Sequence, residues 1–145
     1  EQLDRELSRA TRHERPLSLV ICDIDHFKDV NDEHGHLAGD FVLKEVAQLA
    51  KSRIRPDDVI ARYGGEEIAI ILPETDLAGG IRIAEDLRKM IADETFVFED
   101  DEIEVTISCG VAQLQPGWRA YDFVRGADSQ LYEAKRAGRN CVRPS

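Results

Sequence analysis

The spacing of apolar residues predicts the elements of the first part of the chain. Over residues 3–14, apolar positions recur at helical spacing among alternating Arg and Glu, and Pro16 ends the predicted helix. The continuous apolar run Leu17–Cys22 has the length expected of a buried strand. Between Leu37 and Ile54, apolar residues return every three or four positions, which predicts a second helix that ends before Pro56.

A hairpin is predicted in the middle of the chain. Two short apolar runs, Val59–Arg62 and Glu67–Leu72, flank the turn Tyr63–Glu66, whose two glycines allow a tight reversal. Pro73 ends the second strand, and apolar residues at helical spacing between Leu77 and Ile91 predict a third helix.

The last third of the chain predicts two more strands and a helix. Thr95–Phe98 and Ile103–Cys109 form a second strand pair across the acidic turn Glu99–Glu102. Apolar residues between Phe123 and Ala134 predict the final helix, with Gly138 at the position of a C-terminal cap.

This order of elements predicts an α+β fold. A strand–helix–strand, strand–helix–strand order with a central hairpin is typical of the ferredoxin-like βαββαβ core, in which a mostly antiparallel sheet is flanked by helices. A doubly wound parallel sheet fits less well, because two strand connections lack the crossover helix that parallel neighbours require.

The composition is that of one globular domain. The chain has 145 residues, 42% of them hydrophobic, which is enough for a buried core. Three cysteines without a CxxC pair or zinc-type spacing favour a reducing compartment, and no apolar run approaches the roughly 20 residues of a membrane span. We therefore expect a single cytoplasmic domain over residues 1–145. Because Glu1 lies inside a predicted helix, we expect it to be excised from a longer signalling protein whose other parts could include a membrane anchor.

The charge is strongly negative and unevenly distributed. The 19 basic and 29 acidic residues give a formal charge of −10, which argues against binding nucleic acid polymers or anionic lipid, because both require a basic face. Six acids lie between Asp23 and Asp40, and seven between Asp93 and Glu104, whereas the tail from Leu131 is basic. We interpret the second acidic run as a solvated surface.

Two acids follow the first predicted strand. Asp23 and Asp25 would lie at its carboxyl end, where side chains of an open sheet face a crevice. Paired carboxylates at such a place suit Mg²⁺ bound together with a substrate phosphate. The alternative is that Asp23 only caps a turn.

The hairpin turn offers further acids. Gly64 and Gly65 allow the backbone to approach a ligand closely, and Glu66 and Glu67 follow directly. If the hairpin lies beside the first strand, Glu66 and Asp23 can hold a metal together for phosphoryl transfer. A Gly-Gly turn with solvated glutamates is the alternative.

Several polar residues could bind the rest of a nucleotide. Lys135 and Arg139, with Lys28, could bind a triphosphate, although a basic helix end also complements the helix dipole. Asn31 and Asp40 could bind guanine, although a turn residue and a first-turn helix acid explain them as well.

Two more pairs of residues are candidates for binding a ligand. Arg55 and Asp58 precede the hairpin and could bind a phosphate and a base edge, or form only a surface ion pair. His34 and His36 have no third ligand at a familiar spacing and do not make a convincing metal site.

Four of these segments occur together in the order of one known family. Residues 17–140 resemble the GGDEF family, the diguanylate cyclases. The matching segments are DIDHFKDVNDEHGHLAGD (Asp23–Asp40), RYGGEEI (Arg62–Ile68), TISCGVA (Thr106–Ala112) and ADSQLYEAKRAGRN (Ala127–Asn140). The resemblance implies the nucleotidyl cyclase and polymerase-palm type of the ferredoxin-like fold.

The same resemblance implies an activity. A family member condenses two GTP molecules into cyclic di-GMP and two pyrophosphates, and two domains of a homodimer face each other so that each 3′-hydroxyl attacks the partner's α-phosphate. The implied cofactors are two Mg²⁺ ions per active site, or Mn²⁺ in their place. An upstream sensory or receiver domain is the expected regulatory partner.

Roles at individual positions also follow from the resemblance. It implies that Asp23, the carbonyl of Ile24 and Glu66 are metal ligands, that Glu66 and Glu67 are the catalytic carboxylates, and that Lys135 and Arg139 are the cations for the triphosphate. The other implied substrate contacts are Asn31, Asp40, Lys28, Phe27 and His36, with backbone N–H groups near His26. Arg55 and Asp58 of an RxxD motif are the implied inhibitory site for the product.

One position of the signature motif departs from the family's usual residue, and there are three alternatives to a diguanylate cyclase. Ile68 stands where Phe is usual, and as an inward strand position it should alter core volume more than chemistry. A catalytically silent cyclic di-GMP receptor acting through Arg55 and Asp58 is the main alternative. A phosphorylatable receiver domain is at odds with the Gly-Gly hairpin, and a hybrid-nucleotide cyclase would be expected to alter Asp40.

Overall fold

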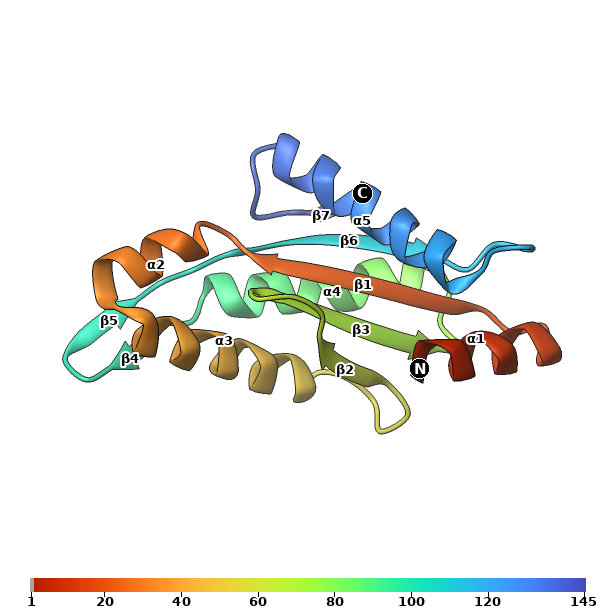
Figure 1. Ribbon diagram of the computed structural model, residues 1–145, viewed down its shortest axis with the longest axis horizontal. Helices are drawn as coiled ribbons and strands as arrows, with labels where there is room; N and C mark the ends of the chain where they lie inside the picture. Colours follow the sequence, from red (N-terminus) through yellow and green to blue (C-terminus); the bar gives the residue numbers. More distant parts are fainter. Residues whose placement is uncertain (1) are drawn as a thin grey trace.

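The computed structural model describes residues 2–145, which form five helices and seven strands around one central sheet (Figure 1). In chain order the elements are α1 (Gln2–His13), β1 (Leu17–Ile24), α2 (Phe27–His34), α3 (His36–Lys51), β2 (Val59–Arg62), β3 (Glu67–Pro73), α4 (Leu77–Ala92), β4 (Phe96–Phe98), β5 (Asp101–Ile103), β6 (Ile107–Gln113), α5 (Ala120–Arg136) and β7 (Val142–Arg143). None of the helices within this described part combines the length and hydrophobicity that a bilayer crossing requires.

The central sheet has the strand order β2-β3-β1-β6-β7. Strand β1 pairs antiparallel with β3 on one side and with β6 on the other, and β2 pairs antiparallel with β3. Strands β1 and β2 are therefore parallel with β3 between them, and β3 and β6 are parallel with β1 between them. Two interleaved split β-α-β units result, which confirms the predicted ferredoxin-like, mostly antiparallel sheet. Strand β7 adds a short parallel pair at one edge.

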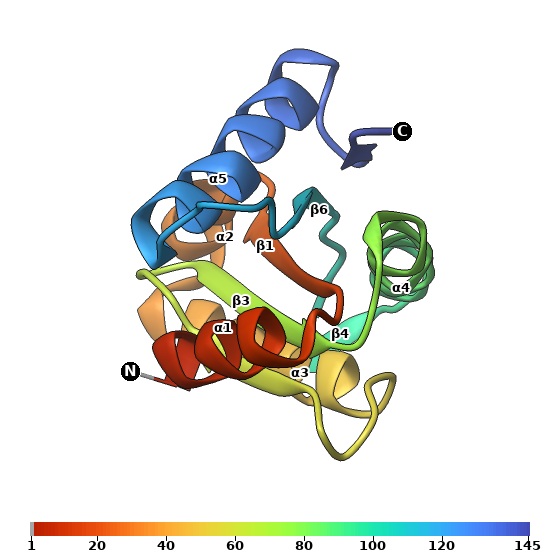
Figure 2. The same ribbon diagram turned by 90° about the vertical axis from the view of Figure 1, so that its right-hand side faces the viewer.

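Helices cover both faces of the sheet (Figure 2). All eight residues of β1 are buried, and successive side chains alternate between the faces. Leu19 and Ile21 pack with Phe123 on the side of α1 and α5, whereas Val20 packs with Val42 on the side of α3 and α4. A strand buried on both faces reads as a continuous apolar run, which is why β1 could be predicted from the sequence.

Helix α5 lies directly on β6 because Gly110 has no side chain. A Cβ at Gly110 would lie 2.2 Å from both the carbonyl oxygen of Ala127 and the backbone nitrogen of Leu131. This close approach fixes the position of the helix that carries Lys135.

Gly138 caps the C-terminus of α5, as the sequence predicted. The Gly138 N–H donates to the Lys135 carbonyl at 3.3 Å, and the Arg139 N–H donates to the Ala134 carbonyl at 3.0 Å. This pair of bonds is a Schellman motif, and Gly138 has the positive φ, +114°, that the motif requires.

The structure corrects the predicted strand Ile103–Cys109. Residues 101–103 pair with β4 in a separate two-stranded sheet, and β6 begins only at Ile107, which pairs with Ile24 of β1. Alternating apolar residues at 103, 105 and 107 continue across the break, so the pattern does not reveal that the chain changes sheets.

The first half of the chain also differs in detail. The predicted helix Leu37–Ile54 begins at His36 and ends at Lys51. Helix α2 was not predicted, because Val30 is its one buried residue and the short segment lacks an apolar period.

Candidate active site

The carboxyl end of β1 and the first residue of β3 place two acids side by side. Asp23 is the cross-strand partner of Glu67, and residues opposite each other in an antiparallel pair project to the same face. Asp23 is 4% exposed, and its Oδ1 atom is the one buried side-chain oxygen or nitrogen within residues 2–145 that has no hydrogen-bond partner. A buried carboxylate oxygen in this state is costly unless a cation or a donor completes it.

Lys135 approaches the same acid from the last turn of α5. Its Nζ forms an ion pair with Asp23 Oδ2, the oxygen that is not orphaned. The lysine thus balances part of the Asp23 charge and leaves Oδ1 directed elsewhere.

The two hairpin glutamates lie in an electronegative environment. Burial raises the pKa of Glu66 above its ordinary value of 4.5, the Asp23 charge raises it further, and Lys135 partly opposes both effects. The pKa of Glu67 is raised by burial and then by the charges of Asp23 and Asp128. Negative charge at this point of the molecule therefore exceeds what Lys135 balances.

Asp128 and Tyr63 belong to this cluster, and the sequence analysis did not single them out. Tyr63 of the hairpin turn and Asp128 of α5 interact electrostatically, and burial raises the pKa of both groups. The usable signal was spacing: Asp128 precedes Lys135 by seven residues, two helical turns, and so shares its face.

The two residues of the predicted guanine-binding pair lie on helices that pack against each other. Asn31 lies on α2 and Asp40 on α3. A Cβ at Gly39 would lie 1.8 Å from Asn31 Oδ1 and 3.3 Å from the Phe27 ring, so the amide of Asn31 occupies the space beside Asp40 that a side chain at 39 would fill.

Other predicted substrate contacts lie around this site with exposed side chains. Lys28 makes a 3.8 Å ion pair with Asp32, and His36 is exposed at the start of α3. Arg139 is exposed just beyond α5. His26 precedes α2 in the left-handed region at φ +55°, a conformation that non-glycine residues adopt at an energetic cost and that recurs at functional sites.

The residues at the end of β1 fit a divalent cation. Within residues 2–145, no three His, Cys, Asp or Glu side chains are gathered closely enough to hold a metal ion alone. The implied set needs only two such side chains, Asp23 and Glu66, together with the Ile24 carbonyl. The Glu66 carbonyl accepts the Ile24 N–H at 3.5 Å, which holds the hairpin turn against the end of β1. Few protein oxygens, one of them an orphaned carboxylate oxygen, match Mg²⁺, which keeps waters and substrate phosphates as its other ligands.

Arg55 and Asp58 form a separate hydrogen-bonded group. The Asp58 side chain is completely buried and accepts the backbone N–H of Arg55 at 2.8 Å and the Arg55 Nη2 at 3.2 Å. Arg55 Nη2 also lies 2.7 Å from the Pro73 carbonyl and from Thr75 Oγ1. The guanidinium is still half-exposed, so Asp58 orients an arginine that is open to a ligand.

Ile68 packs as its position in the strand predicted. It is 2% exposed and belongs to the core cluster on the side of α3 and α4. The residue is thus part of the core and does not face the acids.

Comparison with known proteins extends these observations. The family model described as "Diguanylate cyclase, GGDEF domain" matches residues 1–141. Diguanylate cyclase DgcP of Pseudomonas aeruginosa is 43% identical over 140 residues, which are 97% of this chain and 21% of that protein. The chain spans between about a fifth and a third of the length of the curated relatives it matches.

Solved structures of similar domains share the fold. The GGDEF domain of DgcB from Caulobacter crescentus in complex with c-di-GMP superposes with a TM-score of 0.93 at 34% identity, covering 97% of this chain and 82% of that one. The active GGEEF domain of a diguanylate cyclase from Vibrio cholerae gives a TM-score of 0.90 at 35% identity, covering 99% of this chain and 93% of that one.

Proposed function

The chain belongs to the GGDEF domain family of diguanylate cyclases, and we propose that it condenses two molecules of GTP into one cyclic di-GMP and two pyrophosphates. In each of two equivalent steps, a 3′-hydroxyl oxygen bonds to the α-phosphorus of the other GTP and the α–β phosphoanhydride bond breaks. Pyrophosphate leaves, and a carboxylate accepts the hydroxyl proton. The observation that carries this proposal is the orphaned Oδ1 of Asp23 beside two glutamates of raised pKa and one lysine.

Asp23, the carbonyl of Ile24 and Glu66 would hold the metal, which we propose to be two Mg²⁺ ions, or Mn²⁺ in their place. When bound, divalent cations of this kind stabilise the charge that develops on the phosphates and make the hydroxyl more acidic. The surplus negative charge of the cluster favours such cations before any phosphate is present.

The chain's own side chains would perform the remaining tasks. Glu67 has a raised pKa, which makes it a better proton acceptor than an ordinary glutamate, so we assign it the hydroxyl proton. Lys135 would balance triphosphate charge from α5, with Arg139 beside it. Asn31 and Asp40 would hold guanine by its edge, with further substrate contacts from Phe27, Lys28 and His36.

Two copies of the chain are required by this chemistry. One set of these residues accommodates one GTP, and each nucleotide supplies the hydroxyl that attacks the other. We therefore propose a homodimer that works in the cytoplasm, where GTP is available, within a longer protein whose sensory or receiver domain controls it.

The test of the proposed function compares matched carboxylate variants. Purified dimeric protein incubated with GTP and Mg²⁺ should release cyclic di-GMP, and Glu66→Ala should abolish it. Glu94→Gln, which removes an acid just beyond α4, should leave the rate unchanged. A wild-type rate in the Glu66→Ala variant would contradict the assignment.

Arg55 and Asp58 would bind the product and inhibit the enzyme. The half-exposed guanidinium, oriented by buried Asp58 and by Thr75, suits a phosphate or a guanine edge. Calorimetry should find cyclic di-GMP affinity at least about tenfold weaker in Arg55→Ala, because a charge-assisted contact is lost. Arg53→Ala, two residues away, is the matched control.

This experiment also distinguishes the cyclase from the main alternative, a catalytically silent receptor. Wild-type product affinity in Arg55→Ala would remove the inhibitory site. Product binding through Arg55 without any turnover of GTP would identify a catalytically silent cyclic di-GMP receptor.

A further inference from the structure

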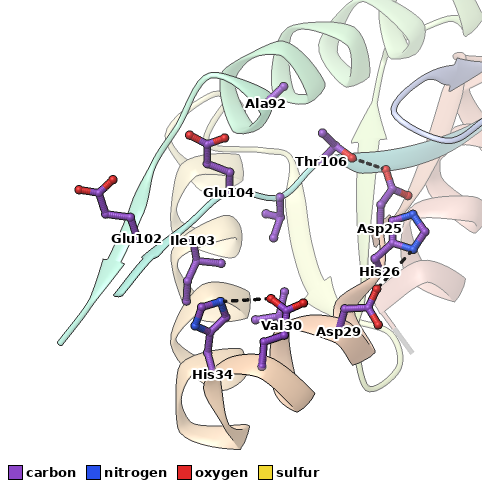
Figure 3. Close-up of a pocket in the computed structure, with 12 residues that line it drawn as sticks. Asp25, His26, Asp29, Val30, His34, Ala92, Glu102, Ile103, Glu104 and Thr106 are labelled. Atoms are coloured by element: carbon purple, nitrogen blue, oxygen red, sulfur yellow. Dashed lines mark hydrogen bonds and ion pairs between the residues drawn. The ribbon is translucent and has the colours of Figure 1, made fainter. Parts of the chain in front are cut away.

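Asp25 is a buried acid that the proposed reaction does not use. It follows Asp23 and Ile24 directly and is 5% exposed. Its Oδ2 accepts the Thr106 hydroxyl at 2.6 Å, and its Oδ1 accepts the Ser108 hydroxyl at 2.6 Å (Figure 3 shows the first of these bonds). In contrast to Asp23, this carboxylate is fully engaged by donors from the protein itself.

A third donor comes from a distant part of the chain. The backbone N–H of Asn140, in the turn between α5 and β7, donates to Asp25 Oδ2 at 3.0 Å. One carboxylate therefore joins the end of β1, strand β6 and the turn that carries Arg139.

That turn has a conformation that needs support. Arg139 and Asn140 both have positive φ, +66° and +49°, which costs energy for residues other than glycine. The Asn140 side-chain oxygen accepts Arg88 Nη1 of α4 at 2.8 Å, which holds the far side of the turn. Two consecutive left-handed residues persist only where their surroundings determine them, and Asp25 supplies the contact on the side of the active site.

We propose that Asp25 is a positioning residue that fixes the Arg139 turn relative to Asp23. Because Asp25 directly follows β1 and lies two residues after Asp23, a turn bound to Asp25 keeps the Arg139 backbone at a fixed place relative to Asp23. The role of Arg139 in binding triphosphate, on which this inference rests, belongs to the proposed function.

The first test measures the contact itself by hydrogen exchange of the Asn140 amide. Asp25→Ala/Ser108→Ala removes the acceptor and one buried donor together, which limits the loss of stability, and Ser108→Ala alone is its matched control. Protection of the Asn140 amide should fall about tenfold or more in the double variant relative to Ser108→Ala. Asp25→Asn should restore it, because its amide oxygen can accept from Asn140 while the rotatable Ser108 hydroxyl accepts from its NH₂ group.

The second test measures affinity for 3′-deoxy-GTP with Mg²⁺, a nucleotide that cannot cyclise. We expect about a tenfold loss in Asp25→Ala/Ser108→Ala and in Arg139→Ala, and no further loss when they are combined, because Asp25 acts through Arg139. Ser108→Ala should retain wild-type affinity although it loses stability, and Asp25→Asn should retain it as well.

The possible results distinguish the positioning role of Asp25 from the proposed function of the chain. Unchanged protection of Asn140 in the double variant, or losses of affinity that add when combined with Arg139→Ala, would overturn the positioning role while leaving the proposed function intact. A wild-type protein that does not bind 3′-deoxy-GTP would instead overturn the proposed function, and the positioning role with it.

Discussion

Gly39 has no side chain and so leaves room for the side chain of Asn31. It lies inside α3, where alanine is the better helix former by about 1 kcal/mol. The space above its Cα is taken by the Asn31 amide, with Oδ1 1.8 Å from where a Cβ would be. A glycine within a helix therefore makes room for Asn31, one of the two residues proposed to bind guanine.

Replacing Gly39 should weaken nucleotide binding with little change in the stability of the fold. Gly39→Ala should leave the free energy of unfolding within about 1 kcal/mol of wild type, because the flexible Asn31 side chain can move aside and alanine favours the helix. The affinity for 3′-deoxy-GTP should fall about tenfold, because the new Cβ displaces the Asn31 amide. Urea denaturation and calorimetry measure the two quantities, and unchanged affinity would count against the guanine-binding role.

The raised pKa values of Glu66 and Glu67 make a prediction about stability and pH. The folded protein holds these protons above pH 4.5, where the unfolded chain has begun to lose them, so the metal-free protein loses stability as pH rises through the raised pKa values. At pH 7 and without divalent ions, Glu66→Gln should therefore be more stable than wild type, by about 0.5 kcal/mol, since the group is partly exposed and screened.

Thermal denaturation across pH measures this effect. The advantage of Glu66→Gln should shrink towards pH 4, and Mg²⁺ should stabilise the wild type more than the variant. Glu94→Gln serves as the control. A destabilised Glu66→Gln protein at neutral pH without metal would show that the glutamate is satisfied by the protein alone.

At the level of elements, α5 and the hairpin bring the charged residues of the candidate active site together. The close contact at Gly110 fixes α5 on β6, and Tyr63 of the hairpin turn interacts with Asp128 of the same helix. The catalytic geometry should therefore depend on a glycine that touches no substrate.

Gly110→Ala tests this dependence. Its Cβ would meet backbone atoms of α5, which cannot turn aside, so we expect a loss of about 3 kcal/mol in the free energy of unfolding. Cyclase activity should fall even where the variant is still folded, because Lys135 moves with the helix. Gly65→Ala, at a position with open space around its Cα, should cost little stability.

The elements that the sequence predicted best have strong apolar patterns of their own. Strand β1 is buried on both faces, and the hairpin of β2 and β3 has its glycines at the turn, so local patterns were sufficient. Helix α2 and the break between β5 and β6 depend on tertiary contacts, such as the pairing of Ile107 with Ile24, that no local pattern contains.

The candidate site residues also differ in how far local sequence patterns could predict them. Motifs singled out Asp23, Glu66 and Asn31 as candidates, whereas the difference between Asp23 and Asp25 could not be predicted from the sequence. One acid of the Asp-x-Asp pair is orphaned and the other is engaged by three donors. Only the positions of Thr106, Ser108 and Asn140 distinguish them.

For the whole molecule, the effect of the formal charge of −10 on binding depends on where the acidic residues cluster. It argues against partners with a continuous phosphate backbone, but a cluster of carboxylates that a divalent cation completes can accept a nucleotide. The acidic run from Asp93 to Glu104 lies around β4 and β5, and Glu102 and Glu104 line a pocket with Asp25 and His26 just beyond β1 (Figure 3). The proposed reaction uses none of the acids in this run.

The fate of GTP in the presence of the dimeric protein and Mg²⁺ tests the central claim most directly. Mass spectrometry of the nucleotides together with a pyrophosphate assay should find cyclic di-GMP and two pyrophosphates for each molecule formed. GTP recovered unchanged from a folded, dimeric sample would contradict the assignment of this chain as a diguanylate cyclase.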